Sequence, residues 1–290
     1  MEDLRPSLTL YAYNILGSYE DAKDIVQDVF LKFTQLNADK IADKKSYLIR
    51  MVVNLAIDHK RKLKKQIDRY PGPWLPEPLA TDDPSFGIHR KEILSYSLLV
   101  LLEKLDSKQR AVFILKEAFD YDHDEVAEVL GITAENSRKI LSRARAELRD
   151  DLRITPDEKQ IETVSRYLEV LDTGDLKKLE QMLHEDITVT SDGGGKVAAL
   201  RNVIRGIAPA AALVSGLHRK KYSTVRSEIR SINHQPAIFF FDGSQIITCQ
   251  IFDIEDGRVR NIFFVRNPDK LEILQKDFQK GVTKSAGLSS

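Results

Sequence analysis

The chain has 290 residues, enough for two or three domains, and its 42% hydrophobic and 30% charged residues are ordinary for a globular protein. Its 44 basic and 44 acidic residues exclude a surface that is basic throughout, but they leave room for local basic stripes. No apolar run approaches the roughly 18 residues of a membrane span, and the acidic N-terminus is not a secretory signal. The single cysteine, Cys249, cannot form an internal disulfide, so we expect a reducing, cytoplasmic setting.

Residues 1–69 predict a helical domain. Apolar residues recur at helical spacing over 8–16, 25–33 and 47–57, and Gly17 and Ser18 separate the first two helices. The third helix, 44–65, has a strongly basic end, since residues 60–69 contain six Lys or Arg and one acidic residue. Such a stripe suits the helix dipole, and it indicates either a solvated helix face or a nucleic-acid surface.

Residues 70–90 predict a linker. Five prolines lie between residues 70 and 88, and proline removes a backbone donor and fixes φ, so neither a helix nor a central strand is expected there. The segment is expected to be extended in part and semi-rigid. It contains the only tryptophan, Trp74, followed by Leu75. Because an exposed Trp-Leu pair would be costly, we expect it to dock on a neighbouring domain.

Residues 91–152 predict a second helical domain that contains a helix-turn-helix over 108–149. A helix at 108–119 precedes a short helix capped by residues 122–124, Gly131 supplies a turn, and Thr133 caps the next helix, 134–148. That helix buries one apolar face. Its outward residues are Glu135, Asn136, Arg138, Lys139, Ser142, Arg143 and Arg145.

This pattern is typical of a DNA-binding helix in the major groove. Residues in the first half of the helix would meet base edges, whereas Arg143 and Arg145 are better placed for phosphates. Residues 138–149 form a second basic stripe, with five Lys or Arg and one acidic residue. An ordinary helical hairpin with a charged outer face is the alternative.

Residues 153–276 predict an α+β domain, and residues 277–290 a flexible tail. A pair of amphipathic helices is expected over 158–184. Strands are expected at 237–241, 245–254 and 259–265, because Asp-Gly pairs at 242–243 and 256–257 are strong hairpin signals. Helices followed by an antiparallel meander favour an α+β architecture.

The first two domains together resemble an extracytoplasmic-function sigma factor. Residues 21–30, Asp-Ala-Lys-Asp-Ile-Val-Gln-Asp-Val-Phe, resemble the region 2 segment that binds the clamp helices of RNA polymerase, which implies polymerase contacts for Asp24, Gln27, Asp28 and Phe30. The helix at 44–65 resembles the one that melts the minus-ten element, which implies DNA contacts for Arg50, Asn54, Asp58 and Arg61. The loop at 37–46 corresponds to the one that captures a flipped base. Residues 108–149 resemble region 4, which recognises the minus-thirty-five element.

Three short motifs extend the resemblance to the group that carries a SnoaL-like cone domain at the C-terminus. They are Trp-Leu-Pro-Glu-Pro at 74–78, Asp-Gly-Gly-Gly-Lys at 192–196 and Asn-Pro-Asp-Lys-Leu at 267–271. In that group the extra domain regulates the sigma factor in cis. The residues expected to take part are Trp74, Leu75, Pro76, Asp192, Gly193, Gly194, Lys196, Asn267, Pro268, Asp269 and Leu271. The fold class expected is therefore multidomain, with two all-α sigma domains followed by an α+β cone.

Relatives of the SnoaL-like fold include isomerases and cyclases, so an enzyme attached to a helical targeting half is the alternative function. The candidates for a general base are Asp192, His184 and His218. We interpret Asp192 as a turn residue before three glycines and the histidines as surface residues, so no catalysis is expected. The glycine run lacks a phosphate-loop context, and the scattered histidines lack metal-ligand spacing, so neither cofactor nor metal is expected.

The expected partners are core RNA polymerase and promoter DNA, with no membrane, and an unidentified small ligand of the C-terminal domain stays open. The three motifs are expected to lie near one another, with the C-terminal domain packed on the linker and on the first domain. A one-component repressor that binds duplex DNA as a dimer ranks lower, because residues 1–69 would then have no purpose.

Overall fold

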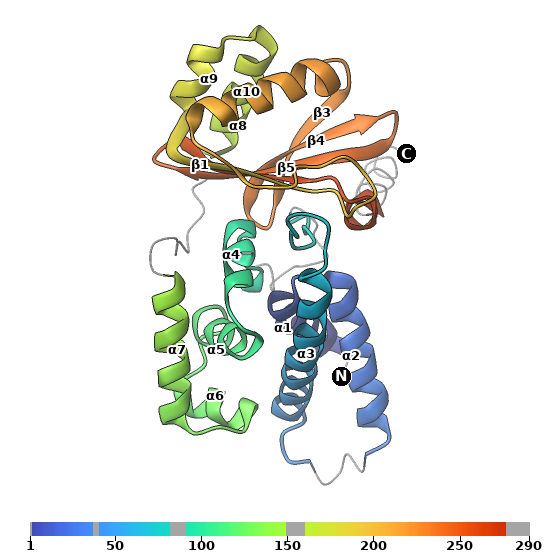
Figure 1. Ribbon diagram of the computed structural model, residues 1–290. Coiled ribbons are helices and arrows are strands. Elements are labelled where there is room, and N and C mark those ends of the chain that lie inside the picture. Colours follow the sequence, from blue (N-terminus) through green and yellow to red (C-terminus); the bar gives the residue numbers. More distant parts are fainter. Residues whose placement is uncertain (1, 37–40, 82–90, 149–159, 277–290) are drawn as a thin grey trace. The chain divides into compact units, whose positions relative to one another are not determined.

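The computed structural model describes residues 2–36, 41–81, 91–148 and 160–276. The chain divides into two compact units (Figure 1). The first comprises residues 1–69, 86–94 and 98–154, and the second comprises residues 70–85, 95–97 and 155–290. Residues 82–90 of the expected linker, part of the loop at 37–46, the boundary near 152 and the tail at 277–290 lie outside the described residues.

Three long helices begin the first unit. The short 3-10 turn η1 (Glu2–Leu4) leads into α1 (Arg5–Leu16), and α2 (Tyr19–Thr34) and α3 (Lys44–Ile67) follow. Gly17 ends α1 at φ 74°, and the Ser18 side chain caps α2 by accepting a hydrogen bond from the Asp21 backbone N–H. All three helices pack on one another, so the three-helix expectation for this part is confirmed.

The helix-turn-helix occupies the second half of the first unit. The short helix α4 (Tyr96–Leu101), whose first two residues belong to the second unit, and the 3-10 turn η4 (Leu102–Lys104) precede α5 (Ser107–Glu117), α6 (His123–Leu130) and α7 (Ala134–Leu148). Asp106 and Asp122 both form capping boxes, and Gly131 turns the chain at φ 62° between α6 and α7. The Thr133 hydroxyl accepts a hydrogen bond from the Asn136 N–H, as a cap should. The structure therefore confirms the expected helix-turn-helix.

A six-stranded sheet forms the second unit, in the order β2-β1-β6-β5-β4-β3. The strands are β1 (Leu183–Asp192), β2 (Ile204–Arg205), β3 (Arg226–Ile232), β4 (Gln235–Asp242), β5 (Gln245–Glu255) and β6 (Arg258–Val265). Strands β3 to β6 form an antiparallel meander, whereas β1 pairs with β6 in parallel. The three expected strands correspond to β4, β5 and β6.

Helices cover one face of this sheet (Figure 1). They are α8 (Gln160–Thr173), α9 (Leu176–Met182) and α10 (Ile207–Leu217), and α10 continues into the π-helical turn η5 (His218–Tyr222). Residues from α8, α10 and the covered face share a buried core that includes Tyr167, Val214, Phe240, Phe252 and Phe264. The α+β expectation is thus confirmed. No described helix is long and apolar enough to cross a membrane.

Candidate nucleic-acid interface and linker site

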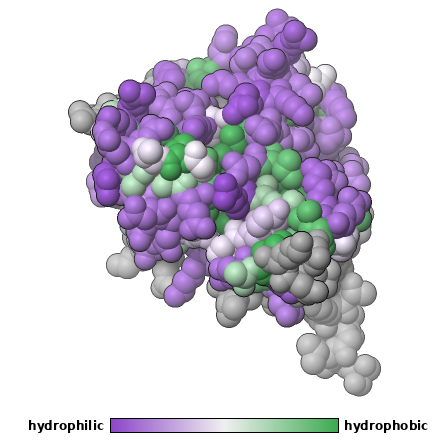
Figure 2. All heavy atoms as spheres, turned by 90° about the horizontal axis from the view of Figure 1, so that it is seen from below, coloured by the Kyte–Doolittle hydropathy of each residue, from purple (hydrophilic) through white to green (hydrophobic). Residues whose placement is uncertain are grey.

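Helix α2 presents a stripe of exposed side chains. Asp24, Gln27 and Asp28 are exposed and lie on one face at helical spacing, whereas Phe30 is buried, with the Arg5 guanidinium carbon 4.7 Å from the centre of its ring. Leu31, 56% exposed, continues the stripe by one turn. Sequence reasoning missed Leu31 because an apolar residue in an amphipathic helix is ordinarily assigned to the core. The surface seen from below is mostly hydrophilic, with apolar side chains reaching it in places (Figure 2).

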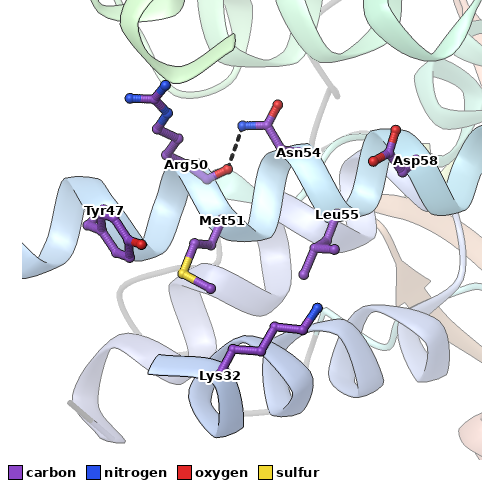
Figure 3. A pocket seen from close by; sticks show the side chains of 7 residues that line it. All are labelled: Lys32, Tyr47, Arg50, Met51, Asn54, Leu55 and Asp58. Carbon is purple, nitrogen blue, oxygen red and sulfur yellow. Dashed lines mark hydrogen bonds between the residues drawn. The ribbon is translucent and has the colours of Figure 1, made fainter. Parts of the chain in front are cut away.

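Helix α3 and helix α2 line a cavity of about 420 Å³ (Figure 3). Its wall is formed by Lys32, Tyr47, Arg50, Met51, Asn54, Leu55 and Asp58. Three of the four DNA contacts expected on α3 therefore share one cavity, and Arg61, exposed and 3.1 Å from Asp58 in an ion pair, lies one turn further along. The cavity combines an aromatic ring, cations and an amide, which suits a stacked and hydrogen-bonded nucleic-acid base.

The amide of Asn54 is already engaged within the first unit. Its Nδ2 donates to the backbone carbonyl of Arg50 at 2.8 Å and to the carbonyl of Val129, in α6, at 2.9 Å. One edge of the α3 surface therefore contacts the helix-turn-helix directly, and the two sequence-predicted DNA-binding elements lie together.

A buried ion cluster also joins these elements. Glu103, in η4, accepts hydrogen bonds from Lys60 of α3 at 2.8 Å and from the fully buried guanidinium of Arg110, in α5. Burial acts to raise the pKa of Glu103, but the two adjacent cations outweigh it and hold that pKa below its ordinary value. Lys60 belongs to the first basic stripe, yet it is buried, so its charge serves the interior and not a DNA surface.

Aromatic rings complete the contact between α1 and the helix-turn-helix. The Tyr11 ring stacks on Phe119 with 3.7 Å between ring centres, and its hydroxyl donates to the hydroxyl of Tyr121 at 3.2 Å. Burial, followed by this hydrogen bond, raises the pKa of Tyr11 far above its ordinary value. The phenol is therefore neutral and is held as part of an apolar contact.

Helix α7 carries the residues expected to recognise duplex DNA. Glu135, Asn136, Arg138, Lys139 and Arg143 are all exposed, while Ser137, Leu141, Ala144 and Leu148 face inward. Lys139 pairs with Glu135 at 2.6 Å along the helix, and Arg145 pairs with Glu117, in α5, at 2.5 Å. Lys139 and Arg145 are therefore paired, whereas Arg138 and Arg143 form no ion pair with any of the described residues.

In the second unit, the carboxylate of Asp192 is fully buried and binds the linker. It accepts hydrogen bonds from the Tyr70 hydroxyl at 2.5 Å, the Leu75 backbone N–H at 3.0 Å, the Gly194 N–H at 2.9 Å and the Lys270 ammonium at 2.6 Å. Burial and the bond to Asp192 raise the pKa of Tyr70 above its ordinary range, so that hydroxyl keeps its proton.

Lys270, in the third sequence motif, contacts residues of the other two motifs. Its ammonium donates to the Leu75 carbonyl and lies 4.2 Å from the centre of the Trp74 ring, a cation–π contact, while it also pairs with Asp192. The expected proximity of Trp74, the Asp192 loop and the Asn267 segment is therefore observed. Tyr70 and Lys270 were missing from the expected set, although Lys270 lies inside the third motif.

The three glycines after Asp192 are required by close approaches. A side chain at Gly193 would collide with the Val197 carbonyl. Gly194, at φ 66°, leaves no room beside the Asn267 side chain, and Gly195, at φ 70°, lies against Pro71 of the linker. Beyond them, Lys196 pairs with Asp269 at 2.6 Å on the surface. Because these residues have no side chains, both the linker and the segment that follows β6 can pack closely against this loop.

The rest of the described linker also lies on this unit. Leu79 exchanges two hydrogen bonds with Asn233, since its N–H donates to the Asn233 side chain at 2.8 Å and its carbonyl accepts from the Asn233 N–H at 2.9 Å. Ala80 forms an isolated bridge to Ile232, and the Tyr96 hydroxyl donates to the Pro76 carbonyl at 2.8 Å. Leu75, Pro76 and Leu79 are buried, which confirms that the Trp-Leu pair docks on a domain.

The three candidates for a general base, Asp192, His184 and His218, each form hydrogen bonds with neighbouring residues. A carboxylate offers about four lone-pair sites, and Asp192 already accepts four hydrogen bonds. The His218 Nε2 lies 2.7 Å from Asp172, and that ring is buried, whereas it was expected on the surface. His184 Nδ1 accepts from the Asp186 N–H at 3.1 Å. Within the described residues there is no cluster of His, Cys, Asp and Glu that could hold a metal ion.

Comparison with known proteins places these surfaces in a family. Residues 1–66 match Sigma-70 region 2, and residues 95–148 match Sigma-70, region 4. The ECF RNA polymerase sigma factor SigJ of Mycobacterium tuberculosis (strain ATCC 25618 / H37Rv) is 30% identical over 287 residues, covering 93% of this chain and 91% of that protein. This chain belongs to the family of extracytoplasmic-function (ECF) RNA polymerase sigma factors.

Two further comparisons extend the likeness over nearly the whole chain. The probable ECF RNA polymerase sigma factor SigI of the same species (strain CDC 1551 / Oshkosh) is 23% identical, covering 96% of this chain and 95% of that one. The crystal structure of M. tuberculosis SigJ has a TM-score of 0.75 and 28% identity, covering 93% of this chain and 96% of that one. The expected ECF sigma factor is thus confirmed, and so is its multidomain fold class of two helical sigma domains followed by an α+β domain.

Proposed function

We propose that this sigma factor brings core RNA polymerase to promoters through three separate surfaces. The α2 stripe of Asp24, Gln27, Asp28 and Leu31 contacts the polymerase. The cavity beside Asn54 takes an unstacked base of the minus-ten element, and the outer face of α7 recognises the minus-thirty-five element. Their exposure, chemistry and family positions support these assignments.

The contact between α3 and α6 carries a second part of the proposal, which is that the described first unit is a closed state. Elements at minus-ten and minus-thirty-five lie about 25 base pairs apart, which is roughly 85 Å of duplex at about 3.4 Å per pair. Asn54 lies 2.9 Å from the Val129 carbonyl of the helix-turn-helix. Regions 2 and 4 must therefore separate before both elements are bound at once.

The C-terminal domain restrains this separation in cis. Residues 70–81, which connect region 2 toward region 4, lie along the C-terminal domain, from the buried Asp192 site, which binds Tyr70 and Leu75, to the bridge between Ala80 and Ile232. Fully extended, that segment would span about 40 Å, so its release adds a large part of the reach that regions 2 and 4 need. Docking of the linker and closure of the first unit thus favour the same inactive arrangement.

An enzyme of the SnoaL-like type is not proposed. Asp192, the carboxylate among the three candidate bases, has its hydrogen-bonding capacity filled by Tyr70 and Leu75 of the linker, by the Gly194 N–H and by Lys270. The same four contacts that make Asp192 a poor base make it a good anchor for the linker.

Run-off transcription with core RNA polymerase tests the proposal. The full-length chain should yield promoter-specific transcripts, and Asp192→Asn should raise their yield because it loosens the linker. The matched control is Asp186→Asn, an exposed carboxylate on the same strand. If neither the full-length chain nor Asp192→Asn directs any transcript, the proposed sigma function is overturned. If Asp192→Asn and the control Asp186→Asn give equal yields, the proposed cis restraint is overturned.

A further inference from the structure

A second cavity lies in the C-terminal domain, between the loop after β1 and helix α10. Its volume is about 190 Å³. Most of its wall is apolar and comes from Leu200, Leu213, Leu217 and Phe264, with Ala198 and Ala199 at the loop side. Phe264 and its neighbours on the sheet belong to the buried core, so the cavity reaches inward from the surface toward that core.

Two cations stand at this apolar cavity, Arg266 and Lys221. Among the described residues, no ion pair neutralises either one, and no carboxylate lines the cavity. The Arg266 guanidinium donates one hydrogen bond to the Ala198 carbonyl, while its Nε is buried without an acceptor. A guanidinium with unused donors beside apolar walls is complementary to an anion that carries a hydrophobic body.

The cavity adjoins the linker site through the chain itself. The Arg266 backbone N–H donates to the Asp192 carbonyl at 2.8 Å, one residue before Asn267 joins the linker cluster. On the loop side, a Cβ atom added to Gly72 of the linker would lie 3.3 Å from the Leu200 carbonyl oxygen. The loop and the linker are therefore in close contact. A molecule in the cavity thus touches both a flank of the Asp192 site and the loop against which the linker packs.

We propose that this cavity binds a small hydrophobic carboxylic acid, aliphatic or aromatic, and that its occupancy is transmitted to the docked linker. The carboxylate is held by Arg266 and Lys221, and the hydrocarbon lies against Leu213, Leu217 and Phe264. The volume is below the roughly 300–1,000 Å³ of sites for drug-sized ligands, so the acid is small. The binding stands without the proposed cis restraint, whereas the effect on transcription rests on it.

Binding is tested on the full-length chain by calorimetric titration with octanoate and with phenylacetate. At least one should bind saturably, and octylamine and octanol should not, because they lack the anion. Arg266→Gln and Lys221→Gln should each weaken binding about tenfold or more, as expected for the loss of a charge-assisted hydrogen bond. Lys220→Gln, an exposed neighbour that does not line the cavity, is the matched control.

Transmission is followed through Trp74, the only tryptophan, whose ring lies under Lys270 in the linker site. Its fluorescence should change with the same midpoint as the calorimetric titration. Should Arg266→Gln fail to fold, Leu213→Phe, which fills the cavity without touching a charge, must abolish binding. No saturable binding of either acid, or equal binding by Lys220→Gln and Lys221→Gln, overturns the site. Binding without a change at Trp74 overturns the transmission and leaves the proposed sigma function intact.

Discussion

The carboxylate of Asp192 lies 2.6 Å from the ammonium of Lys270, and the two side chains are 0% and 7% exposed. Both ions also bind the linker, Asp192 through the Leu75 N–H and Lys270 through the Leu75 carbonyl. A buried ion pair often adds little net stability compared with an apolar pair, but the removal of one partner leaves an uncompensated charge. The linker is thus docked through a contact that is sensitive to single substitutions.

Asp192→Asn should destabilise the C-terminal domain by about 3 kcal/mol, because Lys270 is left buried without its counter-ion. Urea unfolding of the full-length chain, followed by Trp74 fluorescence, measures this change. The double variant Asp192→Asn, Lys270→Met should recover part of the loss. A change below about 1 kcal/mol in the single variant would contradict the assignment of this pair as the anchor.

Glu103→Gln should destabilise the first unit by about 3 kcal/mol or more, since it leaves both Lys60 and the fully buried Arg110 without an anion. The matched control is Glu135→Gln, which removes an exposed pair with Lys139 and should cost no more than about 0.5 kcal/mol. Hydrogen exchange in α3 and α5 locates the effect. Equal protection in the two variants would show that the cluster does not join regions 2 and 4.

His123 predicts a pH dependence of the helix-turn-helix. Burial, followed by the positive charges of Lys116 and Arg138, lowers the pKa of His123 from its ordinary value of 6.5. The unfolded chain therefore takes up this proton first as the pH falls, so the stability is full above about pH 6.5 and decreases below it.

Hydrogen exchange of α6 and α7 at pH 7.5 and pH 5.5 should show this loss of protection in the native chain. His123→Gln should reduce the loss, while His59→Gln, on α3, should leave it unchanged. The same loss in His123→Gln as in the native chain would exclude His123 as its cause.

Arg138→Ala should weaken promoter binding by roughly 1–3 kcal/mol if Arg138 contacts a base edge from the exposed face of α7. The loss should be confined to promoters with the preferred minus-thirty-five sequence, and binding assays on a panel of promoters measure it. Lys177→Ala, which removes an exposed cation of α9 in the C-terminal domain, is the control. A uniform loss on all promoters would show a phosphate contact in place of base recognition.

Local patterns predicted the helical half well. The structure confirms three local predictions, namely the cap at Asp122, the turn at Gly131 and the helical period of α7. Each depends on residues that are close in the sequence. The hairpins of β4 to β6 carry the same kind of signal at Asp242-Gly243 and Asp256-Gly257. The three motifs also predicted one linker site, because their residues are unusual for simple loops.

Pairings over long sequence distances were not predictable in the same way. Strand β1 is polar at its start and pairs in parallel with β6, about 70 residues later, so no local turn marks it. Lys60 was counted in a basic stripe, and only the fold reveals that Glu103 and Arg110 bury it. Tyr70 likewise gains its role from Asp192, a residue of another domain in the sequence.

The closed state of regions 2 and 4 is measured most directly by energy transfer between dyes on introduced cysteines at two exposed positions, Lys62→Cys in α3 and Glu128→Cys in α6. Cys249 is buried, and burial raises the pKa of its thiol, so it should stay unlabelled. Transfer should be efficient in the free chain and should fall when core RNA polymerase binds. Phe119→Ala, which removes the ring stacked on Tyr11, should lower it without polymerase. Unchanged transfer in a polymerase complex that transcribes actively would contradict the closed state.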